Sequence, residues 1–347
     1  MATLAVTNPT LLDLAKLKDP DGTITDIVEI LNETNGVLED ISFIEGNLDT
    51  GHRHTMRTGI PAPTYTKLYG GVQPTKSTTV QVTDTTAMLE AYCEVDKRLA
   101  DMSNNKEAWR MSEDLAHIEG FGQEVANGIF VNDESTSPEK FTGLRPRYND
   151  LSADNAANII NAAGADNNQY EDIWLVGWGP RGCTGIVPKG SVAGLQVRDL
   201  GEDTKVNSDG SMYQVYRTHM MWNVGIALRD WRKVVRVANI DGSILEANSG
   251  LYTPGTGFAN SCSDLTDLMH RAISRLPGST DANRGGERYC FYMSRRMFDS
   301  LRRQVSAKTI ESTLQMENVG GTLITSFMGY PIKRVDALSD VYTTAVS

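Results

Sequence analysis

Residues 47–84 constrain this chain most, because they carry almost no large apolar side chains over nearly forty positions. A connection of that length without structure of its own is uncommon inside a compact domain. Its second half, residues 77–83, alternates as a β-strand does, and Tyr69-Gly70-Gly71-Val72 supplies a turn. An arm of this kind has little to bury within its own subunit. The segment therefore predicts an extended arm that is buried on another copy of the chain, which makes assembly the first hypothesis.

The charge of the chain is acidic overall and unevenly placed. The formal net charge of −11 at pH 7 argues against a broad face that grips nucleic-acid phosphates. Residues 1–46 hold nine carboxylates against two lysines, whereas residues 47–82 hold four cations against one carboxylate. Opposite potentials steer encounter and set register between subunits, so the pattern fits head-to-tail contacts between identical copies. Two ordinarily solvated surfaces are the alternative. The four cations are Arg53, Arg57, Lys67 and Lys76.

Several classes of protein are disfavoured by what the chain lacks. No apolar run approaches the roughly eighteen residues that span a bilayer, and the first residues show no signal-like block. We therefore expect folding in a cytoplasm-like compartment and no membrane partner. The four cysteines are widely spaced without a CxxC pair, which predicts buried free thiols rather than disulfides or a zinc site. His52 and His54 have no further ligand nearby in a suitable spacing, so we expect no metal.

The glycine-rich segment of residues 177–185 is the main candidate for ligand chemistry. A phosphate loop requires Gly, four residues, then Gly-Lys and Ser or Thr, but here Lys189 precedes Gly190. A nucleophile elbow of the GxSxG type is also missing. We predict a tight structural turn, with no catalytic residue and no cofactor. The basic tract of residues 295–303 is interpreted as a surface helix, since its apolar residues fit one core-facing stripe.

Hydrophobic periodicity predicts a mixture of helices and closely spaced strands. The strands are not separated by regular long helices, which favours an α+β fold over a doubly wound parallel sheet. The chain has 347 residues, 40% of them apolar, which is enough for a substantial core. The expected helices are residues 10–17, 23–38, 87–102, 106–130, 156–162, 264–276 and 295–305, the last capped by Ser294. The expected strands are residues 172–178, 213–218, 224–228, 233–238, 288–293, 321–327 and 330–335.

An acidic helical N-terminus, a long arm, a long helix and then mixed strands together resemble the major capsid proteins of tailed phages with the HK97-like fold. Within that family, the chain is most similar to the short-tailed subgroup typified by epsilon15 and Bordetella phage capsids. The likeness spans most of the chain. It is carried by DIVEILNETN (26–35), EGNL (45–48) with TGH (50–52), GVQPTKSTT (71–79), GIVPKGS (185–191) and DWRKVVRVAN (230–239).

The resemblance implies a division of the chain into parts with separate tasks. The helix of residues 106–130 would be the spine helix, and the order of the P and A domains would be permuted, because the elements around residues 295–305 and 329–332 look like A-domain material. No crosslink between a lysine and an asparagine is predicted. The implied parts are an N-terminal arm (1–46), an E-loop (47–84), a P domain (85–250) and an A domain (251–347).

The resemblance further implies a non-enzymatic subunit that self-assembles into an icosahedral shell around packaged double-stranded DNA. Its partners would be itself, as hexamers and pentamers, with a separate scaffold, a portal and a decoration or cement protein, and weak non-specific contact with DNA. Assembly would take place in the host cytoplasm and the product would be the virion. The alternatives are an encapsulin-like nanocompartment shell and a soluble enzyme that holds a phosphate ligand on residues 177–190.

The arm supplies the residues that we expect to contact other subunits. Its cations Arg53, Arg57, Lys67 and Lys76 are expected to form ionic contacts. The large side chains near the turn are expected to act as apolar anchors, because such residues dominate interface energetics. These anchors are Tyr65, Leu68 and Tyr69.

Overall fold

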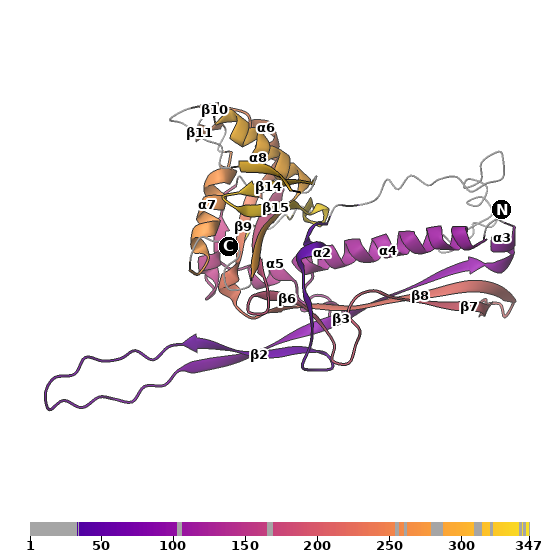
Figure 1. The fold of residues 1–347 in the computed structure, drawn as a ribbon, viewed down its shortest axis with the longest axis horizontal. Coiled ribbons are helices and arrows are strands. Elements are labelled where there is room, and N and C mark those ends of the chain that lie inside the picture. The colour runs from indigo at the N-terminus through magenta and orange to yellow at the C-terminus, as the bar shows by residue number, and fades with distance from the viewer. Residues whose placement is uncertain are drawn as a thin grey trace.

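The computed structural model has a compact unit, an elongated unit beside it and a long arm that projects away from both (Figure 1). The expected helix at residues 10–17, and most of the one at 23–38, lie outside the described residues. The structure describes residues 33, 35–102, 106–164, 169–253, 257–259, 262–278, 287–308, 314–319, 322–339, 342 and 345–346.

The compact unit is built on a mixed sheet. The central strand β5 (Tyr170–Trp178) pairs antiparallel with β9 (Val234–Asp241) and with β12 (Arg288–Met293), and β12 pairs parallel with β15 (Tyr330–Arg334). Every residue of β5 is buried, because apolar side chains on both faces of the strand pack into hydrophobic clusters.

The two faces of β5 pack into different hydrophobic clusters. Ile173 and Leu175 lie in a cluster with α7 (Leu265–Arg275) and α8 (Arg295–Ala307). Trp174 and Val176 point the opposite way, into a cluster that includes the end of α4 (Lys106–Val131). Successive side chains of a strand alternate between faces, so one strand joins both clusters.

The elongated unit places α4 along a second group of strands (Figure 1). β3 (Thr78–Asp96) pairs first with β2 (Gly51–Gly59) and then, from Thr86 onward, with β8 (Met212–Leu228). β7 (Gln196–Val206) pairs with the other side of β8. A single long strand, β3, therefore connects the arm rigidly to the body.

The prediction of a helix at residues 87–102 is wrong. The structure continues β3 through Asp96 and forms only a short helix, α3 (Lys97–Asp101). Ala87, Cys93 and Val95 are buried, whereas Met88 and Tyr92 are exposed. This two-residue alternation governs the segment because pairing with β8 and packing under α4 outweigh the helix propensity of Ala, Met, Leu and Glu.

Two smaller predictions also need correction. The expected helix at 156–162 is a 3₁₀ turn, η1 (Ala156–Asn158), followed by strand β4 (Ile159–Asn161), which pairs parallel with β9. The strands expected at 213–218 and 224–228 form one strand, β8, because the intervening residues continue the pairing with β3.

Several predictions are confirmed. The long helix expected at 106–130 is α4, and β12 has the predicted bounds. Helix α8 begins after Ser294, whose side-chain oxygen accepts a hydrogen bond from the Met297 amide. The α+β class is also confirmed, since antiparallel and parallel pairings coexist in the sheet.

The remaining elements connect these units. They include β1 (Phe43–Glu45), which pairs with β6 (Cys183–Val187), and the hairpin of β13 (Leu314–Val319) and β14 (Thr322–Phe327). Strands on both sides of residue 250 share the sheet of β5 and β12, so the expected division at that residue separates neighbours in one sheet. The domain names stay predictions. The other elements are α2 (Val37–Asp40), α5 (Leu144–Arg147), η2 (Trp231–Lys233), α6 (Gly242–Asn248), β10 (Tyr252–Thr253), β11 (Gly257–Phe258) and η5 (Asp336–Ser339).

Candidate assembly surfaces

The arm is a two-stranded ribbon that ends in an extended loop. β2 and β3 pair antiparallel from Gly51 opposite Thr85 to Gly59 opposite Thr78. Beyond that pair the chain forms no strand until it returns to β3, and Figure 1 shows this loop reaching away from the rest of the molecule. Isolated two-stranded ribbons are marginal in water, so pairing of β2 with β3 alone gives the arm little stability.

The three predicted anchors lie together near the end of the loop and are fully exposed. The exposed fraction is 104% for Tyr65, 91% for Leu68 and 107% for Tyr69. Tyr69 has a φ of 63°, and the Gly70 amide donates to the Lys67 carbonyl at 2.9 Å, so a tight turn presents these side chains. Large apolar side chains grouped in this way mark an interaction surface.

The predicted cations are spread along the arm rather than gathered at one point. Arg53 lies near its root, where its Nε donates to the Thr83 hydroxyl at 3.1 Å. Arg57 lies further along β2, and Lys67 and Lys76 lie on the loop. Within the part of the chain that the structure describes, no ion pair involves any of the four. Their charges are thus available to another molecule.

The root of the arm is held by a charged cluster that the sequence did not reveal. Buried Asp84 accepts a hydrogen bond from Arg147 Nη1 at 2.6 Å and another from the Leu228 amide at 3.2 Å. Arg147 comes from α5 and Leu228 ends β8. These residues are far apart in sequence. The one signal of the cluster in the sequence is the acidic residue Asp84 at an inward-facing strand position.

The two histidines that sequence analysis considered as metal ligands belong to this root. His54 Nδ1 lies 3.6 Å from Asp84 Oδ2, and His52 Nε2 lies 2.9 Å from Arg229 Nη2. Burial lowers the pKa of both imidazoles below the ordinary value of 6.5, and nearby Arg229 lowers that of His52 further. Among the described residues, no group of His, Cys, Asp and Glu side chains is arranged to hold a metal.

Gly51 allows the two strands to approach closely at the root. A Cβ atom at Gly51 would lie 2.1 Å from the Asp84 carbonyl oxygen, which no real contact allows. The arm therefore leaves the body from a tightly packed base, while its outer half has no packing partner within the described residues.

A groove lies between β3 and α4. It has a volume of about 590 Å³. It is lined by apolar residues that include Met88, Ala91 and Phe121, and by two carboxylates, those of Glu90 and Glu124. The pairing with β2 ends where the Thr86 amide donates to the Thr50 carbonyl at 3.0 Å. From there to Asp96 the same edge of β3 has no strand beside it in the described part of the chain.

Three carboxylates of the acidic segment, those of Glu39, Asp40 and Glu45, form contacts within their own subunit. Lys333 Nζ lies 2.9 Å from a carboxylate oxygen of Glu39 and 3.0 Å from one of Asp40. The buried Tyr292 hydroxyl also donates to Asp40 at 2.6 Å, and the Glu45 carboxylate accepts a hydrogen bond from the Gly190 amide at 2.8 Å. These carboxylates tie the N-terminal segment to the compact unit.

The glycine-rich segment of residues 177–185 is a structural turn, as predicted. It joins β5 to β6, and the Gly179 amide donates to the Cys183 carbonyl and the Gly182 amide to the Gly179 carbonyl, both at 3.0 Å. These two amides are therefore already used, whereas a phosphate loop keeps its amides free for the ligand.

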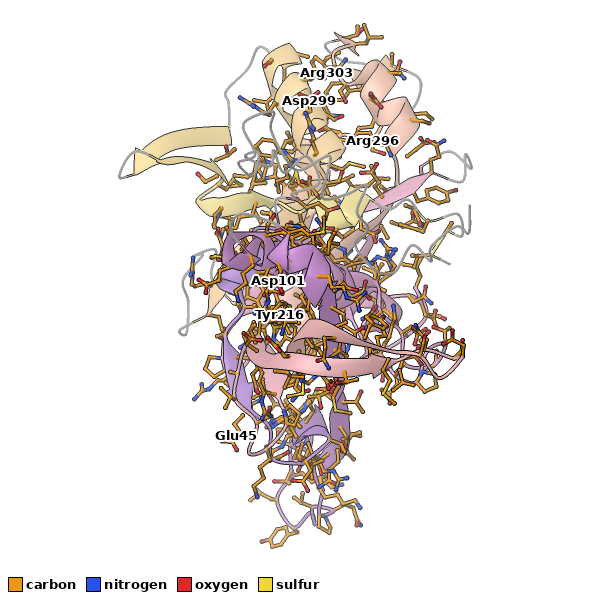
Figure 2. All side chains as sticks on the ribbon, turned by 90° about the vertical axis from the view of Figure 1, so that its right-hand side faces the viewer. Glu45, Asp101, Tyr216, Arg296, Asp299 and Arg303 are labelled. Atoms are coloured by element: carbon orange, nitrogen blue, oxygen red, sulfur yellow. The ribbon has the colours of Figure 1, made fainter. Side chains whose placement is uncertain are left out.

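The basic helix α8 is an amphipathic surface helix, as predicted. Met297 and Leu301 are fully buried, whereas Arg296 pairs with Glu171 and Arg303 Nη1 donates to the Glu246 carbonyl. Figure 2 places Arg296, Asp299 and Arg303 at the end of the molecule opposite Glu45. In the described part of the chain no helix is long and apolar enough to cross a membrane.

All four cysteines are buried free thiols, as predicted. Burial raises the pKa of Cys93 and of Cys183 to about 12, so neither side chain supplies a thiolate nucleophile near neutral pH.

Comparison with known proteins agrees with this geometry. The family model for major capsid protein GP7 matches residues 19–344. A near-atomic structure of bacteriophage epsilon15 is 33% identical, covers 100% of this chain and 99% of that chain, and has a TM-score of 0.76. Comparison with the curated proteins gave no match.

More distant structures were also found. A native GTA capsid is 12% identical, covering 65% of this chain and 96% of that chain, with a TM-score of 0.45. A Synechococcus elongatus encapsulin is 10% identical, covering 69% of this chain and 97% of that chain, with a TM-score of 0.43. Neither likeness carries an argument at this level. The family model and the epsilon15 structure favour a phage capsid protein over the nanocompartment and enzyme alternatives. The chain belongs to the major capsid protein GP7 family, whose members are structural, non-enzymatic shell subunits of bacteriophages with the HK97-like fold.

Proposed function

We propose that this capsid subunit closes an icosahedral shell of hexamers and pentamers around packaged double-stranded DNA, and that residues 47–84 act as its E-loop. The observation that carries the proposal is the arm itself, whose tip residues Tyr65, Leu68 and Tyr69 are exposed beyond 90%. Burial of these side chains on a neighbouring copy would contribute a favourable free energy that the isolated subunit, in which they are exposed, does not gain.

The groove between β3 and α4 is the surface that suits the arm of a neighbour. It is lined by apolar residues together with the carboxylates of Glu90 and Glu124, whereas the arm carries four cations that form no ion pair within the described residues, namely Arg53, Arg57, Lys67 and Lys76. Opposite charges across such a contact favour encounter and fix register.

The remaining parts take the roles expected of them. Residues 1–46 form the N-terminal arm, residues 85–250 the P domain with α4 as its spine, and residues 251–347 the A domain, in permuted order. A separate scaffold, a portal and a decoration protein would complete the particle, and contact with DNA would be weak and non-specific because the chain is acidic. Assembly would occur in the host cytoplasm.

The Arg53→Glu/Arg57→Glu double variant tests the proposal. It should yield a folded subunit that does not form shells, observed by negative-stain microscopy and sedimentation velocity, with circular dichroism as the check on folding. The Arg53→Lys/Arg57→Lys variant is the matched control, because it keeps both charges and should assemble. Normal shells from the glutamate variant would overturn the assignment of the arm.

A further inference from the structure

Beyond the root of the arm, one edge of β3 is an unpaired strand edge. The Thr86 amide donates to the Thr50 carbonyl where the pairing with β2 ends. Alternate residues of a strand direct their backbone groups to the same edge, so every second residue after Thr86 points to the side that β2 leaves. Within the described residues, no strand and no backbone hydrogen bond occupies that side. The residues concerned are Met88, Glu90, Tyr92 and Glu94.

The opposite edge of this part of the sheet is protected against pairing, whereas the edge of β3 is not. On β7 the register shifts between Asp199 and Gly201, and Gly201 has a φ of 72°, so a β-bulge interrupts that edge. Bulges and lysine side chains hinder pairing with another chain, and β7 also carries Lys205. Residues 87–96 pair with β8 without a register shift and include no glycine, proline or lysine. A regular edge of this kind is a template for an added strand.

The groove between β3 and α4 leaves room for such a strand. Its lining includes the consecutive residues 88–91 of β3, with Ala116 and Gly120 on the helix side. A Cβ atom at Gly120 would meet no atom within 4 Å. Strand addition uses main-chain hydrogen bonds along an edge for affinity and pockets for alternate side chains for specificity. The free edge supplies the first and the groove supplies the second.

Residues 60–66 of the arm, with the sequence IPAPTYT, have the pattern that a single added strand requires. Within the described residues they form no strand and no backbone hydrogen bond. Pro61 and Pro63 are two positions apart, so both withdraw an amide from the same edge, while the amides of Ala62 and Thr64 point to the other edge. A residue that precedes proline favours extended conformations. The segment is therefore biased toward a strand that can pair along one edge only.

Antiparallel pairing would place the apolar side chains of this segment in the groove. On β3, the residues that point to the free edge carry side chains on the face away from α4, and Met88 and Tyr92 are accordingly exposed. Hydrogen-bonded residues of an antiparallel pair lie directly opposite each other with their side chains on the same face, so Ala62 and Thr64 would also face away from α4. The residues that alternate with them would face the groove, namely Pro61, Pro63 and Tyr65.

We propose that the free edge of β3 in one subunit binds residues 60–66 of a second copy as an added antiparallel strand. Lys67 follows Tyr65 by two positions, so it shares the groove-facing side and is directed toward the Glu124 carboxylate that lines the groove. This inference rests on the proposed role of the arm and specifies how the arm is held, which is by main-chain hydrogen bonds along β3.

A disulfide scan with a period of two residues tests the inference. Ala116→Cys is combined with a cysteine at each position from 60 to 66 in turn, and the assembled particles are mildly oxidised. The four native cysteines are buried and do not compete. Crosslinks between subunits appear as covalent oligomers on a non-reducing denaturing gel. Positions 61, 63 and 65 should include the highest yield, several-fold above that of each neighbouring position, because only alternate side chains enter the groove.

The other outcomes of the scan separate this inference from the proposed function. Equal yields at neighbouring positions would show that the arm reaches the groove without forming a strand. Particles that give no crosslink at any position would show that the arm docks elsewhere. Either result overturns strand addition and leaves shell formation by the arm in place. Crosslinks within a single chain would overturn both, because the arm would then lie on its own subunit.

A second pair of variants tests the main-chain hydrogen bonds directly. Thr64→Pro removes an amide that should bond to β3, so the protein concentration required for half-maximal shell formation should rise several-fold. Thr75→Pro is the matched control, because Thr75 is also exposed on the loop and also follows a proline, and it should assemble like the unsubstituted protein. Circular dichroism checks that both variants fold. Equal behaviour of the two variants, whether intact or impaired, would contradict strand addition.

Discussion

The arm and the sheet of the compact unit differ in how far their side chains are buried within the subunit. In β5 every residue is buried, and Trp174 packs against Phe130 and Tyr148 with ring centroids 6.0 Å apart. In the arm loop every residue from Ile60 to Lys76 is exposed. The sheet thus gains the free energy of apolar burial within one subunit, whereas the arm can gain it only by contact with another molecule. Subunit stability and assembly should respond to different substitutions.

The largest expected effect comes from the sheet. Trp174→Ala removes a fully buried side chain and should lower the free energy of unfolding by about 3–5 kcal/mol, since it leaves a cavity. Tyr69→Ala should change the stability of the free subunit by less than about 0.5 kcal/mol but should impair shell formation. Chemical denaturation with sedimentation measures both quantities. A large loss of stability from Tyr69→Ala would erase the contrast between the two regions.

The second prediction locates the boundary between these regions at the root of the arm. Asp84→Asn leaves the Arg147 guanidinium without its carboxylate and should cost roughly 3 kcal/mol of unfolding free energy, because one partner of a buried ion pair is removed. Asp49→Asn is the matched control, since Asp49 is exposed. Equal behaviour of the two variants in urea unfolding would mean that the root belongs with the free arm.

A smaller effect is expected at the start of α8. Ser294→Ala removes the oxygen that accepts from the Met297 amide at 3.2 Å and should cost about 1 kcal/mol, the usual value for an N-cap. Ser294→Thr keeps the hydroxyl and should recover most of the loss. Thermal unfolding measures the difference, and shell formation should be unaffected in both variants. An assembly defect in Ser294→Ala at full stability would contradict the separation of the two properties.

The smallest expected effect is a pH dependence at the root. Burial lowers the pKa of His52 and His54 below 6.5, so the folded state binds fewer protons there than the unfolded chain. The resulting sign is that this contribution to stability is complete above pH 6.5 and declines as the pH falls through the lowered values. The opening of β2 amides, obtained from hydrogen exchange after correction for the intrinsic pH dependence of the exchange rate, should therefore increase as the pH falls below 6.5, and His54→Gln should reduce that increase. A β2 exchange profile that shows no such additional opening at acidic pH would refute it.

Much of the architecture was predictable from local pattern. The extent of α4, the Ser294 cap and the strand Arg288–Met293 follow from spacing that is satisfied within a few residues. The arm was predictable for a related reason, because a long polar segment cannot form a core. Its seven contact residues lie on the described arm, while their role in contacts between subunits stays a prediction.

The predictions from sequence were wrong where pairing between residues far apart in the chain determined the secondary structure. Residues 87–96 have good helix formers, yet β8, more than a hundred residues later, pairs with them as a strand. The root cluster of Asp84, Arg147 and Arg229 joins three distant segments, so no local window contains it. The sheet that crosses residue 250 was missed in the same way.

By itself, the sequence determined that this protein has an apolar core, a long helix and a polar arm, because composition and periodicity are properties of neighbouring residues. The tertiary structure alone decided which strands pair and which charges meet at the root of the arm. It also decided that Met111, Leu115 and Ile118 of α4 are exposed. These facts depend on contacts between residues far apart in the chain, whose free energies become available only after the chain has folded.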